Sequence, residues 1–156
     1  MSCGLAVAAL LMMGDPNVVL AAAQPPAVAG APVSVADEPF FADLATRATG
    51  LKAIVDGWSA SGAADQAGFF DSPAYAAFKT EADDLAARDM QGHVILRDRG
   101  TDGDLKCILR GISEDMPLRV AAFEAATTPA ERAVALAELS HLLDDNAAVI
   151  LAPPQS

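Results

Sequence analysis

Cysteine, aromatic residues and cations are scarce in this chain. Of its 156 residues two are cysteines, and only Cys107 would remain after removal of an N-terminal signal, so no intramolecular disulfide is expected in a mature protein. Aromatic side chains make up 5% of the sequence, so a hydrophobic core has to be built mainly from Leu and small side chains. A chain of this length can still bury enough apolar surface to fold as one domain without disulfides.

The shortage of cations argues against anionic partners. Lys and Arg total 10 against 21 Asp and Glu, which gives a formal net charge of −11. Nucleic acids and anionic membrane surfaces are bound by clustered cations, so neither is expected as a partner. The charge suits a solvated surface, or contact with a cationic partner.

The chain also lacks an apolar run long enough to cross a membrane. Leu5–Met13 is apolar but well short of the ~20 residues that a spanning helix needs. Its length is typical of a signal-peptide core, and Ala21–Ala23 supply the small residues expected ahead of a cleavage site before Gln24, although no Lys or Arg precedes the run. We expect a signal peptide at 1–23 and a periplasmic or secreted protein, not integral to the membrane once the signal is removed.

Catalytic and metal motifs are missing as well. The sequence has no G-x-S-x-G, no glycine-rich phosphate loop and no Cys/His spacing of a zinc site. The loop Asp98–Leu109 begins like a calcium loop, but Lys106 and Leu109 occupy its ninth and twelfth positions, and the bidentate Glu is missing. The sequence therefore predicts no metal site, no catalytic residue and no required cofactor, and it favours a non-enzymatic protein.

Helical periodicity is what the sequence does contain. Apolar residues recur at steps of three and four from Phe40 to Trp58, which places them along one helix face. Similar patterns predict helical segments at 38–59, 72–91, 104–113, 117–126 and 129–144. We expect an all-α fold, a small bundle of four to five helices over 38–146, with a Pro/Ala-rich linker (24–37) before it and an extended tail (147–156) after it. The predicted core consists of Phe40, Leu44, Leu51, Val55, Trp58, Tyr75, Phe78, Leu85, Leu105, Ile108, Ile112, Phe123, Leu136, Leu139 and Leu143.

Local signals mark several helix boundaries. Thr128 and Glu131 have the spacing of a capping box, and Pro129 between them suits a first helical position. Pro117 is predicted to interrupt a helix, because its ring clashes with the preceding turn. His93–Arg97 fits either an extension of the second helix or a short extended segment.

Cys107 has two interpretations. It falls near the start of its helix and close to Arg110, an environment that lowers a thiol pKa, so it could react, form a covalent dimer or pair with a redox partner. Alternatively it is a small apolar side chain which, with Gly111 four residues on, lets another helix approach closely.

Two histidines and two methionines are candidate ligands. Met90 and His93 are three residues apart and would share a helix face, a spacing that could serve copper(I) or a haem iron, with Met116 or His141 as a further ligand. The sequence has no C-x-x-C-H for covalent haem attachment. The simpler interpretation is that these are core methionines and solvated or capping histidines.

Three functions follow from these observations. The leading prediction is a non-enzymatic binding or structural protein of the cell envelope, which contacts another envelope protein through an exposed apolar patch or groove. The first alternative is a haem- or metal-binding bundle that uses Met and His ligands. The second is a thiol-linked dimer or redox partner that acts through Cys107.

Overall fold

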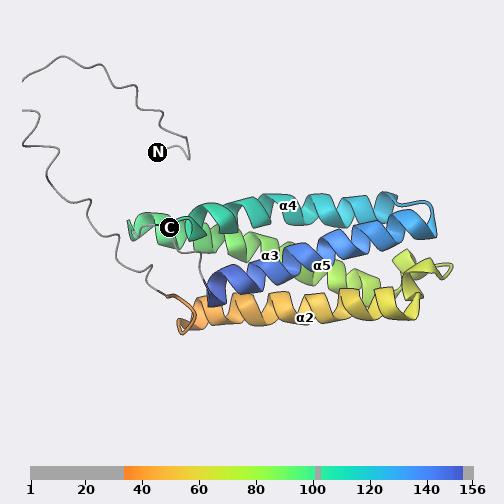
Figure 1. Ribbon diagram of the computed structural model, residues 1–156, viewed down its shortest axis with the longest axis horizontal. Helices are drawn as coiled ribbons and strands as arrows, with labels where there is room; N and C mark the ends of the chain where they lie inside the picture. The colour runs from red at the N-terminus through yellow and green to blue at the C-terminus, as the bar shows by residue number, and fades with distance from the viewer. Residues whose placement is uncertain (1–33, 101–102, 153–156) are drawn as a thin grey trace, which may run out of the picture. The chain divides into compact units, whose positions relative to one another are not determined.

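Four long helices dominate the part of the chain that the structure describes. This computed structural model describes residues 34–100 and 103–152, and within them all regular secondary structure is helical. The elements are α2 (Pro39–Ser61), η1 (Ala63–Asp65), η2 (Phe69–Asp71), α3 (Pro73–Asp98), α4 (Leu105–Ala125) and α5 (Pro129–Leu151), where η marks a short 3₁₀ helix (Figure 1). The prediction of an all-α bundle of four to five helices is confirmed.

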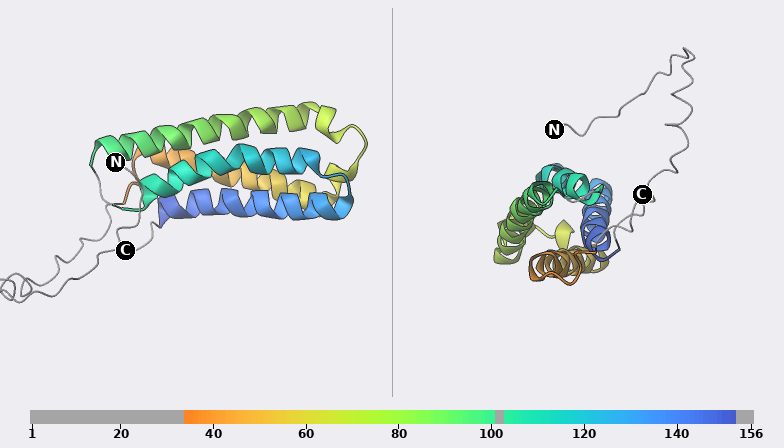
Figure 2. Two further views of the ribbon diagram at one scale, coloured as in Figure 1. Left: turned by 90° about the horizontal axis from the view of Figure 1, so that it is seen from above. Right: turned by 90° about the vertical axis from the view of Figure 1, so that its left-hand side faces the viewer.

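The helices run up and down around a common interior. Each helix packs against the next one in the chain, and α5 returns to pack along α2. As a result α3 lies diagonally opposite α5, and α2 lies diagonally opposite α4 (Figure 2). Short connections between antiparallel helices favour this topology. The signal peptide predicted at 1–23 lies outside the described residues, as does most of the linker predicted at 24–37.

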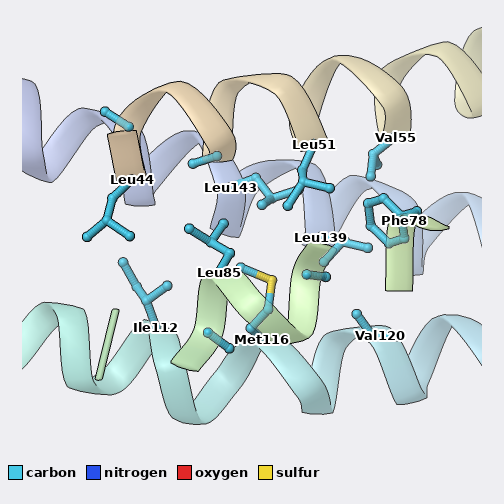
Figure 3. Close-up of a cluster of buried hydrophobic side chains, with 14 of the residues drawn as sticks. Leu44, Leu51, Val55, Phe78, Leu85, Ile112, Met116, Val120, Leu139 and Leu143 are labelled. Atoms are coloured by element: carbon cyan, nitrogen blue, oxygen red, sulfur yellow. The ribbon is translucent and has the colours of Figure 1, made fainter. Parts of the chain in front are cut away.

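Apolar side chains from all four helices fill the interior. Figure 3 shows leucines of α2, α3 and α5 pointing toward Ile112, Met116 and Val120 of α4. Full burial of such a side chain stabilises the fold by about 1.5–3 kcal/mol. Of the predicted core residues, Phe40, Trp58 and Ile108 are half-buried against the core, and the others are buried.

Most of the aromatic rings gather at the end of the bundle that holds η1 and η2. The ring of Trp58 lies 5.0 Å from that of Phe69 and 4.8 Å from that of Phe78, both edge to face. Phe70 and Phe123 join the same cluster, with ring centroids 5.1 Å apart. Edge-to-face contacts are the arrangement that ring quadrupoles prefer, so this cluster closes the bundle where α2 turns back into α3.

Two helix starts are stabilised by side-chain caps. At α5 the hydroxyl of Thr128 accepts a hydrogen bond from the backbone N–H of Glu131 (3.2 Å), and the Glu131 carboxylate accepts one from the backbone N–H of Thr128 (3.0 Å). The predicted capping box is therefore confirmed. At α3 the hydroxyl of Ser72 accepts from the backbone N–H of Tyr75 at 3.2 Å.

The predicted helix break at Pro117 is wrong. α4 is continuous, and Pro117 lies exposed in its interior, so the segments predicted at 104–113 and 117–126 are one helix. Met116 and Val120 are both buried and continue the apolar stripe past the proline. Their burial contributes about 1.5–3 kcal/mol each, enough to offset the roughly 3 kcal/mol that an interior proline costs.

Two other helices are longer than predicted. α3 passes through the ambiguous segment His93–Arg97 and ends at Asp98, with Leu96 buried. α5 reaches Leu151, so residues 147–151 are helical and do not belong to an extended tail. The physical reason is Ile150, which is fully buried and continues the apolar face of the helix.

Candidate functional site

One hollow on the described surface is apolar and has a volume of about 810 Å³. It lies along the seam between the C-terminal half of α4 and the N-terminal half of α5, and we refer to it as the α4–α5 hollow. Alanine side chains are too short to fill this seam, which long side chains would otherwise cover. The apolar lining consists of Ala122, Ala125, Ala126, Ala130, Val134 and Ala135. Val134 is 63% exposed, and Leu118, next to Arg119 in the sequence, is 66% exposed.

Carboxylates border the α4–α5 hollow. Arg119 bridges the two helices: its guanidinium lies 3.0 Å from the carboxylate of Asp115 on α4 and 2.7 Å from that of Glu138 on α5. Glu131, which also lines the hollow, is held by the capping box. The charged residues that line the hollow are one cation, Arg119, and two carboxylates, Glu131 and Glu138, so this border has a net negative charge.

A second feature is a pair of polar side chains in the centre of the bundle. Asp89 of α3 and Asn146 of α5 are both 0% exposed. The amide nitrogen of Asn146 donates a hydrogen bond of 2.6 Å to Oδ2 of Asp89. Because α3 and α5 occupy diagonal corners, this bond crosses the bundle interior.

The buried pair is unusual in its electrostatics. Burial raises the pKa of Asp89 to about 7, and the hydrogen bond from Asn146 opposes that rise only in part. Oδ1 of Asp89 and Oδ1 of Asn146 have no hydrogen-bond partner among the described residues. A buried polar atom without a partner costs roughly 1–3 kcal/mol, so the ionised form of this pair would carry a substantial penalty.

The candidate ligands of the haem or copper alternative are spread over three helices. Met90 and His93 are both half-buried on α3, Met116 is 1% exposed in the core on α4, and the side chain of His141 is 74% exposed on α5. His141 projects outward from the helix diagonally opposite α3. The structure therefore places Met90 and His93 on one helix but does not bring the two histidines into one site.

The remaining sequence candidates lie near the connection between α3 and α4. Cys107 is half-buried in the first turn of α4, and its role as a reactive thiol stays a prediction. Asp98, the first position of the calcium-like loop, forms an ion pair with Arg97 at 2.8 Å. Residues 101–102 of that loop lie outside the described part. Among the described residues, no group of three or more His, Cys, Asp and Glu side chains could hold a metal ion.

Sequence reasoning missed both features of the site. Asp89 follows Leu85 by four residues, and Asn146 follows Leu143 by three, so each polar residue occupies a core position of its helix. A polar residue at a core position of each helix is the sequence signal that predicts such a buried pair. The α4–α5 hollow had no comparable signal, because it depends on which alanines face each other across the seam.

Comparison with known proteins identified no relative: no protein-family model, no curated protein and no solved structure matches the chain. A search of the described helices for one both long and apolar enough to cross a bilayer found none.

Proposed function

We propose that this protein is an exported, non-enzymatic binding protein of the cell envelope, and that it holds a helix of a partner protein in the α4–α5 hollow. The observation that supports the proposal is the exposed apolar surface along this seam, which includes Val134 and the alanines that line the hollow. Apolar grooves rimmed by polar groups are typical of protein–protein contacts. An amphipathic helix can lay its apolar face into such a groove.

The charge around the hollow favours a basic helix over a second copy of this chain. Glu131 and Glu138 line the hollow, and the whole chain carries a formal net charge of −11. A second copy would bring like charge to this border, whereas Lys or Arg side chains flanking an apolar stripe would meet opposite charge. The alanines leave room for Leu-sized side chains on the partner.

The test uses a synthetic amphipathic peptide with Leu and Ala on one face and Lys on both flanks. Titration into the isotope-labelled protein should move the NMR signals of residues 118–138 and leave those of α2 unchanged. A peptide with the same apolar face and Glu flanks should bind more weakly by about tenfold or more, because its charge matches that of the border.

Val134→Glu and Ile54→Glu form a matched pair of variants. Each replaces an exposed branched side chain, but Val134 lines the hollow, whereas Ile54 lies 43% exposed on α2. Val134→Glu should weaken binding of the Lys-flanked peptide by about tenfold or more, and Ile54→Glu should leave it unchanged. Equal effects of the two variants would contradict the proposed site. Sedimentation of the free protein as a dimer that Val134→Glu dissociates would assign the hollow to a second copy instead.

A further inference from the structure

The buried pair of Asp89 and Asn146 lacks one hydrogen-bond donor. Asn146 donates to one oxygen of Asp89 at 2.6 Å, which leaves one oxygen on each side chain without a partner among the described residues. Both of these atoms are acceptors while Asp89 is ionised, so they cannot satisfy one another. A proton on Oδ1 of Asp89 would turn that oxygen into a donor, and Oδ1 of Asn146 is the acceptor left over.

We propose that Asp89 and Asn146 form a closed acid–amide pair in the folded bundle, held by one proton, and that loss of this proton at neutral to alkaline pH loosens the contact between α3 and α5. The pair is a pH-sensitive lock across the diagonal of the bundle. It goes beyond the proposed binding function, because it concerns the stability of the whole bundle and not the α4–α5 hollow.

The charged groups of α2 and α3 around the pair are engaged elsewhere. Arg88, next to Asp89 on α3, binds the carboxylate of Asp43 on α2 at 2.8 Å through Nη2, while its Nε is buried without a hydrogen-bond partner among the described residues. Its guanidinium also lies 5.2 Å from the ring centroid of Phe40. Arg47 of α2 binds the same Asp43 at 2.9 Å. These cations are therefore committed to the surface network and do not neutralise the buried carboxyl.

The same is true of α4 and α5. Asp144 and Asp145 directly precede Asn146 in the sequence, but both are exposed, and Asp145 lies 3.5 Å from His141. On α4, Arg110 binds the exposed carboxylate of Glu114 at 2.8 Å. Burial raises the pKa of Asp89, the hydrogen bond from Asn146 opposes that rise in part, and no charge of a described residue contributes to the shift. The pKa of Asp89 is thus set by its burial and by its hydrogen bond with Asn146.

The direction of the pH effect follows from linkage. Below about pH 4, an Asp is protonated in both the folded and the unfolded chain. The acid–amide pair is then closed, and its protonation does not change the folded-to-unfolded ratio with pH. Between about pH 4 and pH 7 the unfolded chain loses the proton while the folded bundle keeps it. The folded-to-unfolded ratio therefore falls by up to about tenfold per pH unit in this range and levels off above it.

Asp89→Asn provides the test, because an Asn amide donates where the protonated acid donates and cannot ionise. In urea unfolding from pH 4 to pH 9, the wild-type midpoint should fall relative to that of Asp89→Asn, by an amount equivalent to a change of 100-fold or more in the folded-to-unfolded ratio. Asp83→Asn, on the exposed side of the same helix, should behave as wild type. His93→Gln in the same series removes the histidine of α3 and should preserve the fall.

A direct measurement keeps the proposal testable if Asp89→Asn folds poorly. The infrared spectrum of the native protein at pH 6 should contain the carbonyl band of a buried protonated carboxylic acid, which should disappear as the pH is raised. At this higher pH, amide hydrogen exchange in α3 and α5 should be faster in wild type and in the control Asp83→Asn than in Asp89→Asn. Parallel stability curves for wild type and Asp89→Asn, or the absence of the acid band at pH 6, would overturn the proposal.

Discussion

Nδ1 of His93 lies 2.6 Å from the carbonyl oxygen of Lys106, and this contact joins α3 to the first turn of α4. A carbonyl oxygen can only accept, so Nδ1 carries the hydrogen and Nε2 is the nitrogen with a lone pair in the neutral ring. The bond closes the bundle beside the connection between the two helices. It also fixes the direction in which Nε2 points, as backbone carbonyls do for histidines that bind metals.

Replacing His93 should therefore reveal one specific hydrogen bond. His93→Ala should lower the free energy of unfolding by about 1 kcal/mol, whereas His141→Ala, on the exposed face of α5, should change it by less than about 0.5 kcal/mol. Nitrogen-15 NMR, recorded where the imidazole ring is neutral, should show that the hydrogen of the His93 ring is on Nδ1. A hydrogen on Nε2 of His93, or equal effects of the two substitutions, would contradict the assignment.

Gly92 and Gly50 provide a contrast between two helix-interior glycines. A Cβ on Gly92 would come within 3.1 Å of a Leu109 methyl and 3.3 Å of the Phe41 ring, whereas nothing lies within 4 Å of a Cβ on Gly50. Gly50→Ala should stabilise the protein by about 0.5–1 kcal/mol, since alanine favours a helix. At Gly92 the same gain is opposed by collision with two buried side chains, so Gly92→Ala should be neutral or destabilising in urea unfolding. A stabilising Gly92→Ala would show that α3 and α4 do not approach so closely.

The prolines of α4 and α5 make a second matched pair. Pro117 is inside α4, where it removes a backbone hydrogen bond, while Pro129 occupies the first turn of α5, where no such bond is lost. Pro117→Ala should raise the free energy of unfolding by about 1–2 kcal/mol, after allowance for the greater entropy of the unfolded chain. Pro129→Ala should give no gain. Similar results for the two substitutions would indicate that α4 is interrupted at Pro117 in solution.

Sequence reasoning succeeded where the decisive interactions are local. The capping box needs only Thr128 and Glu131, three residues apart, and the apolar stripe from Leu44 to Val55 is set by helical spacing alone. Pro117 shows the limit of local rules. The local rule predicts that it breaks the helix, but α4 continues through it, because the burial of Met116 and Val120 by the other helices outweighs the cost of the proline.

The candidate site could not be predicted from residue spacing along one helix, because it depends on contacts between distant parts of the chain. Asp89 and Asn146 are separated by 57 positions and meet only because α3 and α5 take diagonal corners. The hollow arises where Ala122 and Ala130 line the same antiparallel seam. An alanine of this kind is an ordinary helix former in the sequence, and only the fold shows that it leaves a seam uncovered.

The capping box at the start of α5 gives the last prediction, which includes a pH dependence. Hydrogen bonds from the backbone N–H and hydroxyl of Thr127 and from Thr128 lower the pKa of Glu131. A lowered pKa in the folded state means that the carboxylate stabilises the fold above the unfolded pKa, and that this contribution disappears as the pH falls through the folded pKa. Thr128→Ala should cost about 1 kcal/mol, and Thr128→Ser should retain most of that stability. Glu131→Ala should destabilise at pH 7 and less at pH 3, because pH 3 lies below the unfolded pKa of a Glu, about 4.3, and part of the stabilisation by the carboxylate is then lost. A penalty for Glu131→Ala that is the same at both pH values would show that the ionised carboxylate does not stabilise this helix start.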